Sequence, residues 1–136
     1  MKKFIPFVLH RHEAKKAGLH YDLRLKYPTK KVLASWAIPK ATVPMNIGDK
    51  LLAVRTPDHP MEWLKFGGEI PDGSYGAGIV TIVQRGYVEL LSWSTYAITF
   101  IAYGNPLNGK YSLIKFKSKE RNTETWLFIK GQESEN

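Results

Sequence analysis

Short apolar or alternating runs, each closed by a turn signal, limit the folds that this sequence can adopt. The runs are rich in Val, Ile, Tyr, Phe and Trp, and Gly, Pro, Asn or Asp separate them, which is typical of β-strands joined by turns. No stretch keeps a helical apolar period beyond a turn or two, and residues 61–66 come closest. The expected strands are 5–11, 19–27, 31–38, 51–56, 78–84, 86–92, 96–103, 110–117 and 124–130.

Many short strands at this spacing predict an all-β fold, either an antiparallel barrel or a sandwich. The 136 residues suit one domain and no linker divides them, so we expect a single domain over 1–136, with a frayed tail at 132–136. The sequence has no cysteine. Disulfides and thiolate ligands are therefore excluded, and any metal site must use nitrogen and oxygen ligands.

The N-terminal segment places Lys2 and Lys3 ahead of an apolar stretch, as a secretion signal does. Pro6 interrupts that stretch, which ends at His10 with no small-residue cleavage site behind it. No apolar run approaches the length of a membrane span. Together with the lack of cysteine, these features predict a soluble, cytoplasmic protein with no membrane partner.

Positive charge is concentrated near the N-terminus. The formal net charge is +8, and residues 1–31 hold nine of the 20 Lys and Arg residues but only two of the 12 Asp and Glu residues. Such an uneven distribution predicts either a surface that binds polyanions such as nucleic acid or a solvated basic face that aids solubility. Charge alone does not separate these two interpretations.

Histidines and charged residues alternate with apolar residues in two neighbouring expected strands. Alternate side chains of a strand share a face, so His20, Asp22 and Arg24 point one way, while the apolar residues between them point towards a core. His10 and His12 likewise share a face of the preceding strand. The sequence therefore predicts a row of imidazole, carboxylate and guanidinium groups on one sheet face.

A turn at residues 13–18 would bring His12 beside His20 and Asp22. Two imidazoles and one carboxylate with open positions suit Mn²⁺, Zn²⁺ or Fe²⁺. Arg24, one pleat further along, would offer a two-pronged contact to a phosphate on that metal. The alternative is a row of polar residues on an exposed sheet face, which the spacing does not exclude.

Two further segments carry weaker signals. His59 stands between Pro57 and Pro60, which predicts a rigid turn rather than a strand. There it can bind phosphate, donate a proton or simply cap the backbone. Residues 66–78 contain five glycines and match neither a Walker loop nor a dinucleotide fingerprint, so we favour a wide connection over direct phosphate binding.

These motifs, in this order, resemble the 3′-phosphoesterase domain of bacterial and archaeal ligase D end-joining proteins. The resemblance runs from residue 7 to about residue 86, with a looser match at 126–130. The stretches that carry it are Phe7-Val8 leading to His12 and Ala14, Leu19-His20-Tyr21-Asp22-Leu23-Arg24-Leu25, Ser35-Trp36-Ala37-Ile38-Pro39-Lys40, Leu52-Ala53-Val54, Asp58-His59-Pro60 and Ile70-Pro71-Asp72-Gly73-Ser74-Tyr75-Gly76-Ala77-Gly78.

The resemblance implies a closed antiparallel β-barrel of about eight strands with at most short helical turns. It also implies a Mn²⁺-dependent phosphoesterase that trims a terminal ribonucleoside and removes the 3′-phosphate, leaving the 3′-hydroxyl that repair or ligation requires. Zn²⁺ or Co²⁺ can occupy such a site in the isolated protein. The implied partners are 3′ ends of DNA or RNA, in a primer-template or a nicked duplex, and a DNA ligase or polymerase supplied in trans.

The resemblance also assigns residues by motif position. The implied metal ligands are His12, His20 and Asp22. The implied catalytic residues, which contact the phosphate or lie near it, are His59, Arg24, His10 and Lys40. His10 replaces a glutamine that faces the phosphate in the family pattern.

The sequence departs from the family pattern elsewhere. The turn between His12 and His20 is longer, Trp63 replaces a tyrosine whose hydroxyl would reach the phosphate, Gly67 replaces a glutamate, and Gln84 stands where aspartate is common. The changes at Trp63 and Gly67 favour a second hypothesis, a nucleic-acid end-binding module with weakened catalysis on the same barrel. A third is a single-strand binder that stacks bases on aromatic residues, but such a binder has no need of the metal-ligand row.

Overall fold

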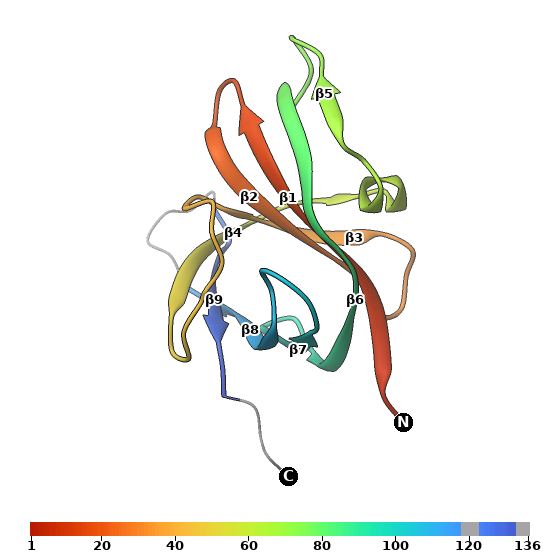
Figure 1. Ribbon diagram of the computed structural model, residues 1–136, viewed down its shortest axis with the longest axis vertical. Coiled ribbons are helices and arrows are strands. Elements are labelled where there is room, and N and C mark those ends of the chain that lie inside the picture. The colour runs from red at the N-terminus through yellow and green to blue at the C-terminus, as the bar shows by residue number, and fades with distance from the viewer. Residues whose placement is uncertain (118–122, 133–136) are drawn as a thin grey trace.

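The computed structural model describes residues 1–117 and 123–132, which form strands joined by turns (Figure 1). The strands are β1 (Lys3–Ala14), β2 (Gly18–Lys26), β3 (Leu33–Ile38), β4 (Lys50–His59), β5 (Gly68–Ile70), β6 (Gly78–Trp93), β7 (Ala97–Ala102), β8 (Gly109–Phe116) and β9 (Thr125–Lys130). A single turn of 3-10 helix, η1 (Met61–Leu64), is the only helical element in this part of the chain. No helix among these residues is long and apolar enough to cross a membrane. Beyond residue 132, the tail expected to fray lies outside the described residues.

Eight of the strands close into a ring. Each strand pairs antiparallel with the next in the order β1-β2-β3-β4-β9-β8-β7-β6, and β6 pairs with β1. The first residues of the 16-residue β6 also pair with β5, on the edge opposite β1. The all-β fold and the closed, barrel-like arrangement of about eight strands are therefore confirmed.

Two segments differ from the strands expected from the sequence. Residues 78–84 and 86–92 form one strand, β6, because Gly86 (φ 156°) continues the strand and pairs with Phe7 of β1. Residues 68–70 form the short strand β5, although they were expected in a connection. The glycine-rich segment therefore begins as an edge strand before it becomes a loop.

The expectation that His59 lies in a rigid turn is wrong. His59 is the last residue of β4 and lies opposite Leu33. The register between β3 and β4 shifts between Leu33 and Ser35, so Pro57 falls in a bulge, where a residue without an N–H group is tolerated. The flanking prolines suggested a turn, but the bulge accommodates Pro57 within the strand.

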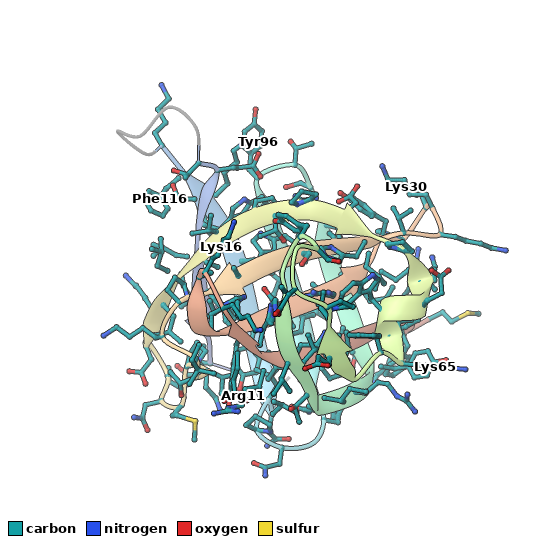
Figure 2. All side chains as sticks on the ribbon, turned by 90° about the horizontal axis from the view of Figure 1, so that it is seen from above. Arg11, Lys16, Lys30, Lys65, Tyr96 and Phe116 are labelled. Carbon is teal, nitrogen blue, oxygen red and sulfur yellow. The ribbon has the colours of Figure 1, made fainter. Side chains whose placement is uncertain are left out.

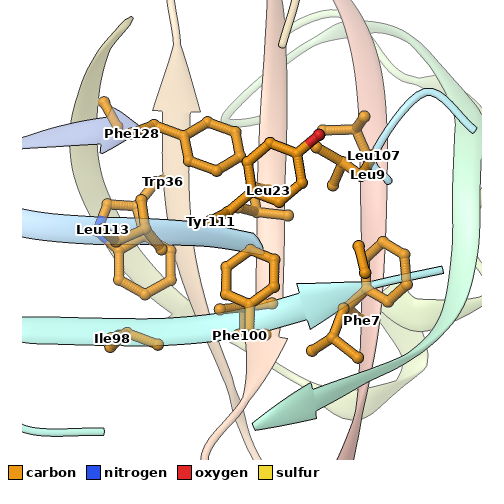
Figure 3. Close-up of a cluster of buried hydrophobic side chains, with 14 of the residues drawn as sticks. Phe7, Leu9, Leu23, Trp36, Ile98, Phe100, Leu107, Tyr111, Leu113 and Phe128 are labelled. Carbon is orange, nitrogen blue, oxygen red and sulfur yellow. The ribbon is translucent and has the colours of Figure 1, made fainter. Parts of the chain in front are cut away.

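All eight ring strands contribute to one hydrophobic core (Figure 3). The ring centroid of Tyr111 lies 5.8 Å from that of Phe100 and 5.3 Å from that of Phe128. Trp36 meets Trp126 edge to face, with centroids 5.5 Å apart. Because each large buried side chain contributes about 1.5–3 kcal/mol, this core stabilises the ring without covalent cross-links.

The face of β1 and β2 that points away from this core is also buried. The register places His10 opposite Asp22, and His12 opposite His20, while Arg24 follows on the same side of β2. The segment from η1 to the loop at residues 71–77 covers this face. The alternation expected in β2 is therefore confirmed, and it positions the candidate site between the sheet and its cover.

Candidate functional site

The proposed metal-ligating side chains come together on the covered face of β1 and β2. His12, His20 and Asp22 offer ligand atoms that all lie within 4.8 Å of one another. The Oδ2 atom of Asp22 is 3.4 Å from Nδ1 of His12 and 3.2 Å from Nε2 of His20. Two ring nitrogens and a carboxylate oxygen thus converge, which is a donor set suited to divalent transition-metal ions.

Backbone carbonyls fix the orientation of both imidazoles. His12 Nε2 donates a hydrogen bond to the Gly76 carbonyl at 2.7 Å, and His20 Nδ1 donates one to the Gly18 carbonyl at 3.2 Å. A neutral imidazole has one N–H, so the lone pairs remain on the two nitrogens that face Asp22. Lone pairs directed at a carboxylate repel it unless a cation lies between them, and metal-bound histidines generally have such outer hydrogen bonds. These residues therefore fit a metal ion.

The carboxylate in this cluster is held in its ionised form. Burial raises the pKa of Asp22, but the contacts that protonated His12 and His20 rings make with its carboxylate, together with the charge of Arg24, outweigh burial and keep this pKa well below its usual range. The hydrogen bond with Asp22 in turn raises the pKa of His20. A proton on His20 and a metal ion are therefore alternative ways to balance the same negative charge.

Arg24 is a buried cation beside the cluster. Its Nη1 lies 3.7 Å from Asp22 Oδ2 and donates to the Ser35 hydroxyl at 3.4 Å, and its guanidinium carbon lies 5.0 Å from the centroid of the Trp63 ring. Within the described part of the chain, Arg24 Nε has no hydrogen-bond partner. A guanidinium that lines the cavity next to a metal-binding cluster is suited to bind a phosphate oxygen.

His59 faces the same cavity from β4. Its Nδ1 donates to the Pro57 carbonyl at 2.7 Å, which leaves the lone pair on Nε2. Burial and the charge of Arg24 lower the pKa of His59, so the ring is neutral near pH 7. It packs edge to face on Trp63, with centroids 5.0 Å apart. Trp63, one of the departures from the family pattern, therefore contacts three of the implied catalytic residues, Arg24, His59 and His10.

His10 and Lys40 lie outside the lining of this cavity. His10 is fully buried, and its Nε2 donates to the Phe66 carbonyl at 2.9 Å. Burial and the charge of Arg24 lower the pKa of His10 to about 4, so it is neutral. Lys40 is exposed in the turn after β3, next to the lining residue Pro39. Their catalytic roles remain predictions.

The cavity has a volume of about 640 Å³. Its lining includes the proposed metal ligands, Arg24, His59 and Trp63, together with residues 14–17 and 72–77. In the view from above, Lys16 falls within the outline of the protein, whereas Lys30 and Lys65 lie at its periphery (Figure 2). The residue pattern predicted only a wide connection for residues 72–77, and not their place in the lining, because a loop has no periodicity.

Comparison with known proteins agrees with this arrangement. The family model of the DNA ligase D 3′-phosphoesterase domain matches residues 10–115. The multifunctional non-homologous end joining protein LigD of Mycolicibacterium smegmatis is 36% identical over 141 residues, which cover 96% of this chain and 17% of that protein. The corresponding DNA repair protein of Mycobacterium tuberculosis is 37% identical over 125 residues, which cover 89% of this chain and 15% of that protein.

A third relative, the multifunctional non-homologous end joining protein LigD of Pseudomonas aeruginosa, is 32% identical over 134 residues, which cover 95% of this chain. The chain spans only 15% to 17% of the length of these three proteins. The similarity therefore concerns one domain of each relative.

Proposed function

The chain belongs to the DNA ligase D 3′-phosphoesterase domain family, and from this we propose that it is a Mn²⁺-dependent phosphoesterase that converts blocked nucleic-acid 3′ ends to 3′-hydroxyls. The blocks are a 3′-phosphate or a terminal ribonucleoside. A DNA ligase or polymerase would then use the healed end. The observation that carries this proposal is the convergence of His12 Nδ1, His20 Nε2 and Asp22 Oδ2 beside the buried guanidinium of Arg24.

His12, His20 and Asp22 would hold the metal ion. When bound, a divalent ion supplies positive charge that polarises a phosphoryl oxygen and makes the phosphorus easier to attack. The carbonyls of Gly18 and Gly76 keep both imidazoles in the ligating tautomer. Because these hydrogen bonds already exist in the free protein, the ligand set needs little rearrangement.

Arg24 would bind the phosphate oxygens and stabilise the negative charge that develops on them. Its guanidinium is held in place by Ser35, Asp22 and the face of Trp63. A charge fixed before the reaction in a largely buried site stabilises a transition state more than a mobile surface charge does. Arg24 thus performs the electrostatic part of catalysis.

His59 would act on the leaving oxygen or on a phosphate oxygen through Nε2. In the free protein this nitrogen carries a lone pair, because Nδ1 donates to Pro57. An incoming phosphate dianion raises the pKa of a neighbouring imidazole, which favours a proton on Nε2 once substrate is bound. As a water molecule attacks phosphorus and the ester P–O bond breaks, His59 can donate that proton to the leaving 3′ oxygen, and the attacking water gives up a proton to solvent.

Metal titration and an end-healing assay together test this proposal. We expect calorimetry to show one Mn²⁺ per chain for the parent and no binding for Asp22→Ala, while Asp49→Ala, which removes an exposed carboxylate in a turn, binds as the parent does. Only the two metal-binding proteins should release phosphate from a 3′-phosphate primer or shorten a 3′-ribonucleotide primer. Unchanged Mn²⁺ affinity in Asp22→Ala would overturn the ligand assignment.

A second candidate function is a 3′-end-binding module with weakened catalysis. Trp63 favours it, because an indole in contact with Arg24 and His59 offers no hydroxyl to a phosphate oxygen. The same assay separates the two functions. A parent protein that binds Mn²⁺ and the primer but leaves both 3′ ends intact would be a binding module.

A further inference from the structure

The cavity has room for more than a phosphate. Its volume of about 640 Å³ falls in the range of roughly 300–1,000 Å³ that is typical of sites for whole small molecules. Its lining combines charged residues, among them Asp22 and Arg24, with the apolar and aromatic side chains of Leu19, Ile70, Trp63 and Tyr75. A phosphate bound beside Arg24 would leave room in the cavity for another group of the same substrate.

Tyr75 is the most exposed aromatic side chain in that lining. It is 83% exposed, whereas Trp63 already packs against His59 and Phe66, with centroids 5.0 Å and 4.7 Å away. Tyr75 and Arg24 line the same cavity. The ring is thus a solvated aromatic surface beside the proposed phosphate position.

The loop that carries Tyr75 is anchored on both sides of this residue. Before it, Asp72 forms an ion pair with Lys15. After it, the Gly76 carbonyl accepts the hydrogen bond from His12, and the Ala77 carbonyl accepts one from the Lys15 backbone N–H at 2.9 Å. The position of Tyr75 is therefore tied to a proposed metal ligand and to the turn between β1 and β2.

Two glycines give the loop its tight path. Gly73 (φ 85°) and Gly76 (φ 75°) adopt left-handed conformations that other residues enter at a cost of about 1–2 kcal/mol. Turn hydrogen bonds from Ser74 N to Pro71 O and from Ala77 N to Ser74 O complete the path. An exposed aromatic ring on a loop held this firmly is prepared to pack against a ligand, because little of the loop remains to be ordered on binding.

We infer that Tyr75 forms a nucleobase subsite, on which the base of the nucleotide that carries the 3′-phosphate stacks. This inference rests on the proposed function, because that function places the phosphate beside Arg24 and the metal ligands. Stacking needs the face of the ring and not its hydroxyl, and every base offers a π-face, so the subsite binds the terminal nucleotide with little dependence on sequence.

Three variants and a fluorescent primer test the subsite. Tyr75→Ala removes the ring, Tyr75→Phe keeps the ring without its hydroxyl, and Tyr96→Ala is the matched control, since Tyr96 is also exposed but lies outside the cavity lining. The probe is a primer with 2-aminopurine at its 3′-terminal nucleotide and a 3′-hydroxyl, which is not hydrolysed. We expect the parent, Tyr75→Phe and Tyr96→Ala to quench the probe, and Tyr75→Ala to leave it bright.

Steady-state kinetics on the 3′-phosphate primer give the second measurement. Loss of a stacked base weakens binding by about 1–3 kcal/mol, so KM of Tyr75→Ala should rise about 5- to 150-fold. The value of kcat at saturation and the Mn²⁺ affinity should stay as in the parent, because stacking contributes equally to the bound substrate and the transition state. Tyr75→Phe should have the KM of the parent.

The outcomes separate this inference from the proposed function. A Tyr75→Ala protein with the KM and quenching of the parent overturns the subsite and leaves the phosphoesterase proposal standing. A Tyr75→Phe protein as impaired as Tyr75→Ala also overturns it, because the hydroxyl and not the ring face would then be the contact. If the parent releases no phosphate, the proposed function fails, and quenching that depends on the Tyr75 ring still supports the subsite.

Discussion

The two faces of the wall formed by β1, β2 and β3 are both buried, but by different means. On the inner face, Leu9 and Leu23 pack into the core and are 0% exposed. On the outer face, Asp22 is 5% exposed and Arg24 is 3% exposed, beneath a cover that comes from η1 and the loop after β5. Alternation along the same strands therefore produces an apolar face and a charged face from adjacent residues.

The two faces contribute differently to stability. Apolar burial on the inner face favours folding by about 25 cal/mol for each Å² removed from water. Burial of charges on the outer face opposes folding unless they pair, and here Asp22 and Arg24 pair only in part, since Arg24 Nε has no partner among the described residues. We expect the inner face to determine stability and the outer face to determine activity.

The largest expected effect lies on the charged face. Arg24→Ala and His59→Ala should each lower kcat on a 3′-phosphate primer by about 10²–10⁴-fold, the usual loss for one electrostatic or proton-transfer group. Both proteins should fold and bind Mn²⁺. Arg24→Lys should recover little activity, because an ammonium cannot reproduce the two-pronged contact. A His59→Ala enzyme within a few-fold of the parent would remove His59 from the reaction.

Substitution of the adjacent residue on the inner face should have the opposite result. Leu23→Ala is expected to lower the free energy of unfolding by about 2–5 kcal/mol in urea denaturation, through lost apolar contacts and a cavity. At temperatures where it stays folded, its Mn²⁺ affinity and kcat should be those of the parent. The control is Leu52→Ala, which truncates a leucine that is 42% exposed. A selective loss of Mn²⁺ binding in folded Leu23→Ala would show that the two faces are coupled.

The outer face was predictable from sequence where alternation and pairing determine it. The alternating pattern of β2 places His20, Asp22 and Arg24 on one side, and the short turn to β1 brings His12 opposite His20. These relations depend on neighbouring residues and one hairpin register, which local sequence specifies. The charged face could therefore be derived before the structure was known.

The cover of that face could not be derived in the same way. The contact of Trp63 with Arg24 joins β2 to η1, far away along the chain, and the Gly76 carbonyl that orients His12 comes from a loop without periodicity. From the sequence, Pro57 suggested a turn. It lies instead in a bulge of β4, and the position of that bulge depends on how β4 pairs with β3, which the sequence of β4 alone does not reveal. Long-range packing and a shifted register are not contained in residue spacing.

Gly76 connects the cover to the charged face, so its substitution should have an intermediate effect. An alanine there is strained at φ 75°, and its Cβ would touch His12 Cε1 at 3.4 Å, so relief of that strain in Gly76→Ala should shift the carbonyl that orients His12. Lost outer hydrogen bonds typically weaken metal binding by about 10–100-fold, and calorimetric titration with Mn²⁺ measures this. Gly48→Ala is the matched control, with similar strain (φ 92°) and no atom of the described residues within 4 Å of its Cβ. Equal Mn²⁺ affinity for the two variants would contradict a role for the Gly76 carbonyl.

The smallest expected effect concerns charge at the mouth of the cavity, where the two faces end in the turn between β1 and β2. Lys15 and Lys16 both line the cavity, but Lys15 is paired with Asp72. If both lysines contact phosphates of the substrate backbone, removing them together flattens the slope of log affinity against log salt by up to about two units, at roughly 0.9 per contact. Lys16→Ala should account for about one unit and Lys15→Ala for less, since Asp72 already balances part of the charge of Lys15.

The measurement is the affinity for a 3′-hydroxyl primer over a series of KCl concentrations, with Lys50→Ala as a control outside the cavity lining. A Lys16→Ala protein with the slope of the parent would show that this turn does not face the nucleic acid.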